Sequence, residues 1–125
     1  MLAVHEFACS LLKQGANLNT YEEAVMHYAG EKLRELGLIR TISKETVREF
    51  YPHATSHFLG IDTHDVGDHD APLVAGMVLT VEPGIYIAQE GIAIRLEDTV
   101  LITEGGNINL SEQLVKQSDS LSGRS

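Results

Sequence analysis

The chain has 125 residues, of which 43% are hydrophobic and 22% charged, and its formal net charge at pH 7 is −9. This length suits one soluble domain with a buried core. The acidic balance and scattered basic residues argue against nucleic-acid or membrane binding, and no apolar run approaches the roughly 20 residues that span a bilayer. A single cysteine, Cys9, excludes an intrachain disulfide, and with no signal-peptide pattern at the start it favours a cytoplasmic location.

The first half of the chain is predicted to be helical. A first helix ends at Gly15, and a second begins with a capping box of Thr20 and Glu23 and ends at Gly37. A short third helix is capped by Ser43 and runs to about residue 50. The apolar positions that indicate the first two helices are Leu2, Phe7, Leu11 and Leu12, then Ala24, Tyr28, Leu33 and Leu36.

The second half is predicted to form strands. Residues 77–87 are apolar and rich in β-branched side chains, and residues 91–103 alternate with period two. The short AQEG connection between them suits a tight hairpin. Helices followed by a mostly antiparallel sheet make an α+β fold.

This hairpin predicts a pair of opposed acids. A turn centred between Gln89 and Glu90 pairs residues whose numbers sum to 179, and Glu82 with Glu97 gives that sum. Opposed like charges destabilise a sheet unless one carboxylate is protonated or a cation lies between them. Two interpretations stay open: a slipped register with both acids solvated, or a paired-carboxylate site. Pro83, which lacks an N–H, indicates a bend beside Glu82.

Residues 53–70, HATSHFLGIDTHDVGDHD, contain four of the six histidines. Their imidazoles are suitable ligands for Mn, Fe, Co or Zn, and one histidine with the two glutamates would make a three-ligand site for a hydrolytic metal. The alternative is that each histidine is structural, with Asp62, Asp65, Asp68 and Asp70 forming turns around Gly60 and Gly67. His5 and His27 lie on the helices without a suggested role.

Three motifs carry a resemblance to a known family. SHFLGIDTHDVGD, AGMVLTVEPGIYI and GIAIRLEDTVLIT occur in this order and closely resemble the metal-dependent Xaa-Pro peptidases, aminopeptidase P and prolidase, which have the pita-bread fold. The resemblance is most specific from His53 to Asn109 and extends in pattern over the preceding helices. It implies a hydrolase that cleaves the peptide bond before proline in a peptide substrate.

The resemblance implies a role for each matching residue. His57, Glu82 and Glu97 resemble metal ligands, with Glu82 also moving a proton and Glu97 bridging two ions, most typically Mn²⁺, with Co²⁺ or Zn²⁺ as alternatives. His53 and His64 resemble the histidines that line the substrate site and shuttle protons. The remaining pair, Tyr86 and Arg95, resembles residues that organise the site beside the leaving group.

The sequence also departs from the family pattern. Ala54 and Ala93 replace common glycines, and Thr99 replaces a common aspartate. Two further aspartate ligands of the family precede the helices that open this chain. We therefore expect residues 1–117 to be the C-terminal portion of a pita-bread catalytic domain and residues 118–125 to be a disordered polar tail.

Three ligands would hold at most one ion, so we expect the isolated chain to be inactive. An exposed sheet edge and apolar face would favour homo-oligomerisation or dependence on the other half of the domain. A non-catalytic binding module that keeps the fold is the alternative function.

Overall fold

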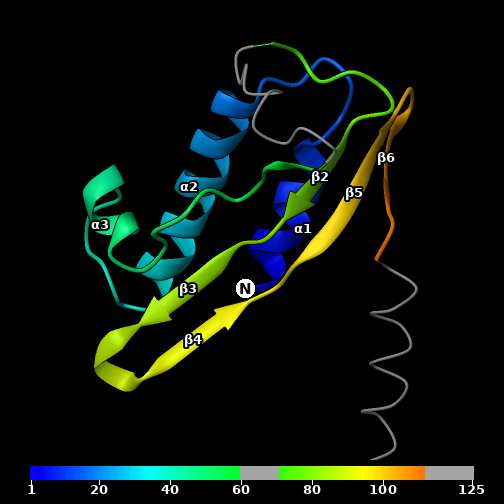
Figure 1. Cartoon of the computed structure of the whole chain (residues 1–125). Helices are drawn as coiled ribbons and strands as arrows, with labels where there is room; N and C mark the ends of the chain where they lie inside the picture. Colours follow the sequence, from blue (N-terminus) through cyan, green and yellow to red (C-terminus); the bar gives the residue numbers. More distant parts are fainter. Residues whose placement is uncertain (60–70, 112–125) are drawn as a thin grey trace, which may run out of the picture.

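The protein is described here by a computed structural model that covers residues 1–59 and 71–111. Three helices come first: α1 (Leu2–Leu11), α2 (Leu18–Glu35) and α3 (Lys44–Arg48) (Figure 1). The predicted end of the second helix is confirmed, because Gly37 has a φ of 78° and its N–H donates to a carbonyl in the last turn. The predicted cap of the third helix, Ser43, is also confirmed.

The predicted start of the second helix is wrong. Asn17 is the N-cap, and its side-chain oxygen accepts the Thr20 N–H at 3.0 Å. The helix therefore begins three residues early, which brings Leu18 and Tyr21 onto its buried face. A short amide side chain is at least as good a cap as threonine, and burial of these two side chains favours the earlier start.

The predicted apolar faces of the helices are only partly correct. Leu2 is 63% exposed and Leu36 is 70% exposed, so neither belongs to the core. The buried positions instead follow the contact with the sheet. They are Val4, His5 and Ala8 in α1, and Leu18, Tyr21, Val25, Ala29, Gly30 and Leu33 in α2.

The strands that follow are antiparallel, as predicted. A sheet of order β1-β2-β5-β6 is formed by β1 (Phe58–Leu59), β2 (Val78–Val81), β5 (Asp98–Thr103) and β6 (Gly106–Asn109). A separate two-stranded ribbon consists of β3 (Gly84–Ile87) and β4 (Ile92–Arg95). The short helix η1 (Ala88–Glu90) and Gly91, at φ 64°, close the predicted hairpin.

The two long strands predicted from the sequence are each interrupted once, and the breaks lie opposite each other. Residues 82–83 separate β2 from β3, and residues 96–97 separate β4 from β5. Pro83 donates no hydrogen bond, although its carbonyl accepts the Leu96 N–H at 3.2 Å. At this break, where Pro83 predicts a bend, regular pairing stops and the two-stranded ribbon continues from the end of the main sheet (Figure 1).

The predicted register is confirmed on both sides of the break. Val81 pairs with Asp98, and 81 plus 98 is 179; Gly84 pairs with Arg95, and 84 plus 95 is also 179. Glu82 and Glu97 are therefore opposite each other inside the break.

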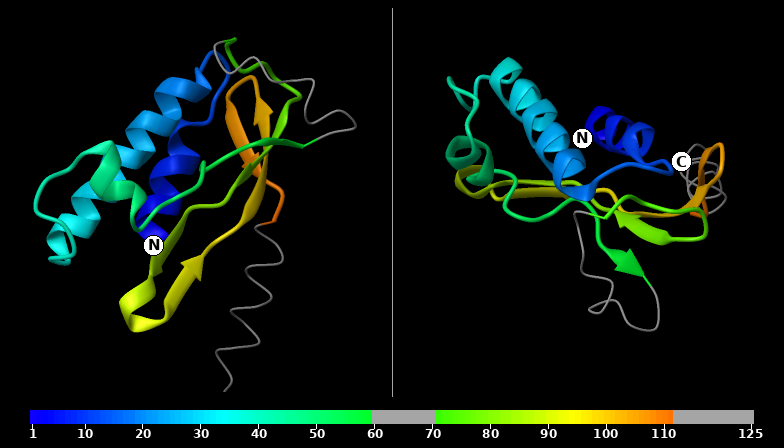
Figure 2. Two further views of the ribbon diagram at one scale, coloured as in Figure 1. Left: turned by 60° about the vertical axis from the view of Figure 1, so that its left-hand side comes forward. Right: turned by 90° about the horizontal axis from the view of Figure 1, so that it is seen from above.

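Helices α1 and α2 cover one face of the sheet (Figure 2). The hydrophobic core lies between these layers, and no helix in the described ranges is long and apolar enough to cross a membrane. The fully buried side chains of this core include Val4, Ala8, Leu12, Val25, Ala29, Leu33, Leu79, Val81 and Val100. Since neighbouring side chains of a strand point to opposite faces, Glu82 and Glu97 lie on the sheet face away from the helices.

Candidate metal and substrate site

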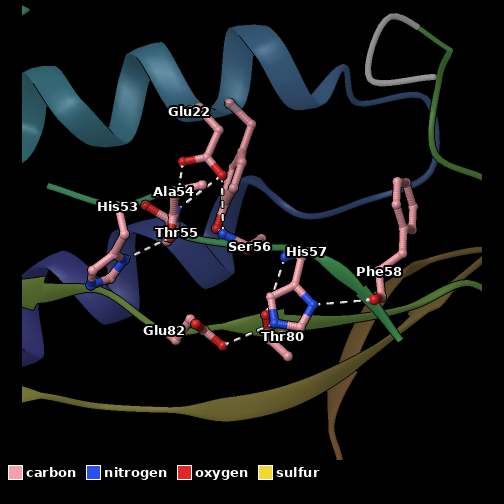
Figure 3. Close-up of polar contacts among 10 residues, drawn as sticks. Glu22, His53, Ala54, Thr55, Ser56, His57, Phe58, Thr80 and Glu82 are labelled. Atoms are coloured by element: carbon pink, nitrogen blue, oxygen red, sulfur yellow. Dashed lines mark hydrogen bonds and ion pairs between the residues drawn. The ribbon is translucent and has the colours of Figure 1, made fainter. Parts of the chain in front are cut away.

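The loop that carries His53 and His57 is anchored to α2 by the carboxylate of Glu22 (Figure 3). Thr55 N–H donates to Oε1 at 2.8 Å and to Oε2 at 3.1 Å, and Ser56 N–H donates to Oε2 at 3.0 Å. Hydrogen bonds to an ionised carboxylate are stronger than those between neutral groups. A single side chain of the helix layer therefore fixes the backbone between the two histidines.

Two buried tyrosines support the same loop. Tyr21 Oη lies 2.7 Å from Ser56 Oγ, and the Tyr51 hydroxyl hydrogen-bonds the Thr55 hydroxyl. Burial raises the pKa of both phenols well above its usual value. Both tyrosines therefore stay neutral, which suits a buried hydrogen-bond network.

On its other side the loop is bonded to β2. Glu82 N–H donates to Thr55 O at 2.7 Å, Thr80 N–H donates to His57 O at 2.9 Å, and His57 N–H donates to Thr80 Oγ1 at 3.1 Å. The pairing of β1 with β2 thus continues irregularly beyond the two residues of β1. This pairing brings His57 alongside Glu82.

His57 and Glu82 face each other through a ring nitrogen and a carboxylate oxygen. His57 Nε2 lies 3.3 Å from Glu82 Oε2, and the side chains are 57% and 15% exposed respectively. The other ring nitrogen, Nδ1, lies 3.2 Å from Phe58 O and can donate its proton there. A neutral imidazole in that tautomer presents a lone pair to the carboxylate, so a proton or a cation between the two atoms is needed for attraction.

The second pair is formed by Glu82 and Glu97. The pKa of the Glu97 carboxyl is raised, first because it hydrogen-bonds Glu82, then because of the Glu82 charge and desolvation, while Arg95 and His57 lower it. Two ionised carboxylates placed side by side repel each other, and a shared proton or a cation relieves that repulsion. The slipped register that would leave these acids apart is excluded by the pairing of Val81 with Asp98 and of Gly84 with Arg95.

His53 is held beside β3. Its Nδ1 lies 2.8 Å from Ala54 O and can donate to it, and its Nε2 lies 3.3 Å from Tyr86 Oη, which then donates. Gly84 makes this approach feasible: a Cβ at that position would lie 2.8 Å from His53 Nε2 and 3.1 Å from the Tyr86 hydroxyl. Tyr86 and its neighbours on β3 are in turn fixed by the Tyr86 N–H, which donates to Phe50 O at 2.8 Å.

The predicted residues form two adjacent groups. One joins His57 to Glu82 and Glu82 to Glu97; the other joins His53 to Tyr86. Within residues 1–59 and 71–111, no three His, Cys, Asp or Glu side chains already converge on one point as a metal-binding group. The donor chemistry nevertheless fits a divalent ion, because Glu82 faces an imidazole lone pair on one side and a carboxylate on the other. His64 and the aspartates of residues 60–70 lie outside the described residues.

A cavity of about 700 Å³ lies on the other side of the loop, between α2, α3 and residues 51–55. Its lining contains His53 but neither Glu82 nor Glu97. It is therefore separate from the acid pair.

Comparison with known proteins identifies the family. A sequence profile of metallopeptidase family M24 matches residues 1–104. The chain belongs to this family. The relatives it resembles include an Xaa-Pro aminopeptidase of Escherichia coli strain K12, 37% identical over 93% of the chain, and Xaa-Pro aminopeptidase 3 of Rattus norvegicus, 35% identical over 94%. The chain spans only 30% and 26% of the length of these two relatives.

Solved structures support the same relationship. The structure of Escherichia coli aminopeptidase P with the inhibitor Pro-Leu is similar at a TM-score of 0.76 and 38% identity, over 88% of this chain and 29% of that one. Aminopeptidase PepP of Pseudomonas aeruginosa is similar at a TM-score of 0.77 and 33% identity, over 89% and 29% of the two chains. The predicted α+β pita-bread fold is therefore confirmed.

Sequence reasoning missed three residues that make buried or anchoring contacts next to this site. Glu22 gave no signal, because its partners are backbone N–H groups 33 and 34 residues away. His5 was assigned no role, although its side chain is buried with Nε2 at 3.0 Å from Asp98 Oδ2. Asp98 could have been found, because it occupies an inward position in the alternation that includes Val100 and Ile102.

Proposed function

We propose that this chain contributes metal ligands and substrate-site residues to an Xaa-Pro peptidase, which hydrolyses the peptide bond preceding proline. The observation that carries this proposal is the shared position of Glu82 between the His57 lone pair and the Glu97 carboxyl. The names of the relatives support the substrate class. The alternative of a non-catalytic module is less favoured, since such a module would have no need of opposed acids that repel each other without a cation.

In this proposal His57, Glu82 and Glu97 are the metal ligands. Mn²⁺ is the proposed ion, with Co²⁺ or Zn²⁺ as alternatives, since imidazole and carboxylate donors suit all three. When bound, such an ion lowers the pKa of a coordinated water and polarises the scissile carbonyl. Three side chains would hold at most one ion, so we expect full activity only in a longer chain that supplies the two aspartate ligands of the family.

The remaining residues handle the peptide and its proton. The proline ring nitrogen carries no hydrogen in the substrate, so it must gain a proton to leave. Glu82 is proposed to take a proton from the attacking water and pass it towards that nitrogen, with His53 and His64 lining the peptide and assisting the transfer. The Tyr86 hydroxyl fixes the His53 ring, and Arg95 ends β4 two residues before Glu97, near enough for its charge to lower the pKa of the Glu97 carboxyl.

We also propose that another part of the fold or a second copy of the chain covers the apolar side chains that the sheets leave open. Ile92, Ile94 and Ile108 are 43%, 49% and 52% exposed. Light scattering over a concentration series would detect self-association of the chain. A cytoplasmic location remains a prediction that rests on the cysteine content.

Calorimetric titration with Mn²⁺ tests the ligand set. We expect the 125-residue chain to bind no more than one ion, and His57→Gln, Glu82→Gln and Glu97→Gln each to weaken binding at least about tenfold. The control is His27→Gln, because His27 is an exposed helix residue paired only with Glu31 among the contacts described. Equal affinity in all four variants would rule out this ligand set.

Hydrolysis of an Xaa-Pro dipeptide with Mn²⁺ tests the activity. We expect little or no turnover by the isolated chain and turnover by a longer chain that carries the additional aspartates. A longer chain that is loaded with metal yet inert on every Xaa-Pro peptide would overturn the proposal.

A further inference from the structure

Glu97 occupies an unusual place in the sheet. It lies in the two-residue break between β4 and β5, outside the paired registers of both ladders. Its side chain is exposed, and the residue opposite it is Glu82, which lies in the other break rather than in a regular strand. The backbone at Glu97 therefore needs a second constraint if the carboxyl is to stay opposite Glu82.

The next residue, Asp98, supplies such a constraint from the buried side. One oxygen, Oδ2, lies 3.0 Å from His5 Nε2 of α1 and accepts the Asn109 Nδ2–H of β6 at 2.9 Å. The side chains of His5 and Asp98 are each only 9% exposed. A helix and a strand from opposite ends of the chain thus meet on one carboxylate oxygen beside Glu97.

His5 depends on this contact as much as Asp98 does. His5 Nε2 is buried, and no group in the described residues meets the full geometric criteria for a hydrogen bond to it. The Asp98 oxygen at 3.0 Å is nevertheless the group that compensates it. Cys9 Sγ lies 3.9 Å from His5 Nδ1, and burial raises the pKa of the Cys9 thiol to about 11. The thiol therefore keeps its proton and can donate to Nδ1, which leaves the ring proton on Nε2, the nitrogen next to Asp98.

We propose that His5 is a positioning residue for Glu97, acting through Asp98. Successive side chains of a strand point to opposite faces, so holding the Asp98 carboxylate among α1 and β6 fixes the direction in which Glu97 projects from the other face. The inference rests on the proposed function, in which Glu97 is a metal ligand. It assigns to the first helix a role in the site that its position in the sequence does not suggest.

The test compares substitutions at His5 with a matched core variant. His5→Leu removes the nitrogen, and His5→Gln restores an N–H at a similar reach. Val4→Ala disturbs the same buried face of α1 but keeps the His5 and Asp98 side chains. The first readout is the backbone ¹⁵N order parameter of Glu97 in the metal-free 125-residue chain. We expect it to fall from about 0.85 to below about 0.6 in His5→Leu and to stay near 0.85 in the other two variants.

The second readout is Mn²⁺ affinity by calorimetry. We expect His5→Leu to lose about tenfold or more, and His5→Gln and Val4→Ala to stay within about threefold of the unsubstituted chain. If His5→Leu does not fold, Asn109→Ala, which removes the other partner of Asp98, takes its place with the same expected direction.

The outcomes separate this inference from the proposed function. An unchanged Glu97 order parameter in His5→Leu, or an equal fall in Val4→Ala, overturns the positioning role whatever the metal affinity. Equal Mn²⁺ affinity in His57→Gln, Glu82→Gln, Glu97→Gln and the control His27→Gln overturns the ligand assignment, while the order parameter still decides whether His5 orders Glu97.

Discussion

Replacement of Glu22 by glutamine should destabilise the protein through the loop that carries His53 and His57. The carboxylate accepts the N–H groups of Thr55 and Ser56 at 2.8–3.1 Å. Glutamine keeps one carbonyl oxygen but presents an NH₂ group to the second N–H. One charge-assisted hydrogen bond is then lost and the other becomes neutral.

The magnitude follows from these two changes. A hydrogen bond to a charged group contributes about 1.5–3 kcal/mol and a neutral one about 1 kcal/mol, so the combined loss is about 3 kcal/mol. For a chain of 125 residues this lowers Tm by about 10 °C. The loss is well above the roughly 0.5 kcal/mol expected for an ordinary surface substitution.

Urea unfolding followed by circular dichroism measures the effect. We expect the midpoint for Glu22→Gln to fall while the slope m stays constant, since the surface exposed on unfolding is unchanged. The control is Glu23→Gln, because Glu23 is the next residue of α2 and is exposed. If Glu22→Gln were as stable as this control, the carboxylate would not be the anchor of the loop.

Three further predictions address the strand, the thiol and the helix start. Gly84→Ala should displace His53 and cost about 1–3 kcal/mol, measured by urea unfolding, whereas Gly105→Ala, with open space around it, should cost less. The Cys9 thiol should react with a disulfide reagent at pH 8 about 100-fold more slowly in the folded chain than in guanidinium, because its pKa rises from 9.0 to about 11; equal rates would contradict this. Asn17→Ala should lower the unfolding free energy by about 1 kcal/mol and Thr20→Ala by much less; the reverse order would favour the cap expected from the sequence.

The sequence was sufficient to predict the central geometry of the site. The hairpin register that opposes Glu82 and Glu97 follows from the period-two alternation and the short turn, both of which are local. The bend at Pro83 was equally accessible, because a missing N–H acts on its own strand.

Other features depend on contacts between distant segments and could not be found locally. The buried face of α2 is chosen by the sheet it covers, and the helix begins at Asn17 because Leu18 and Tyr21 enter that contact. Glu22 on a helix looks like any solvated acid until the loop that it caps is placed beside it. The ligand roles themselves came from family resemblance and stay predictions, and His64 lies outside the described residues.

The register shared by the two ladders also has an evolutionary consequence. Paired residue numbers add up to 179 both in the main sheet and in the ribbon. The pairing of β2 with β5 alone therefore places Glu82 opposite Glu97, whatever the length of the hairpin tip. Residues added in pairs at η1 would lengthen the ribbon and leave Glu82 opposite Glu97. By contrast, one residue inserted between Glu82 and Gly84 would turn each side chain of β3 to the opposite face of the ribbon. We expect the tip to be the place where related proteins can change length and acquire new surface without rebuilding their chemistry.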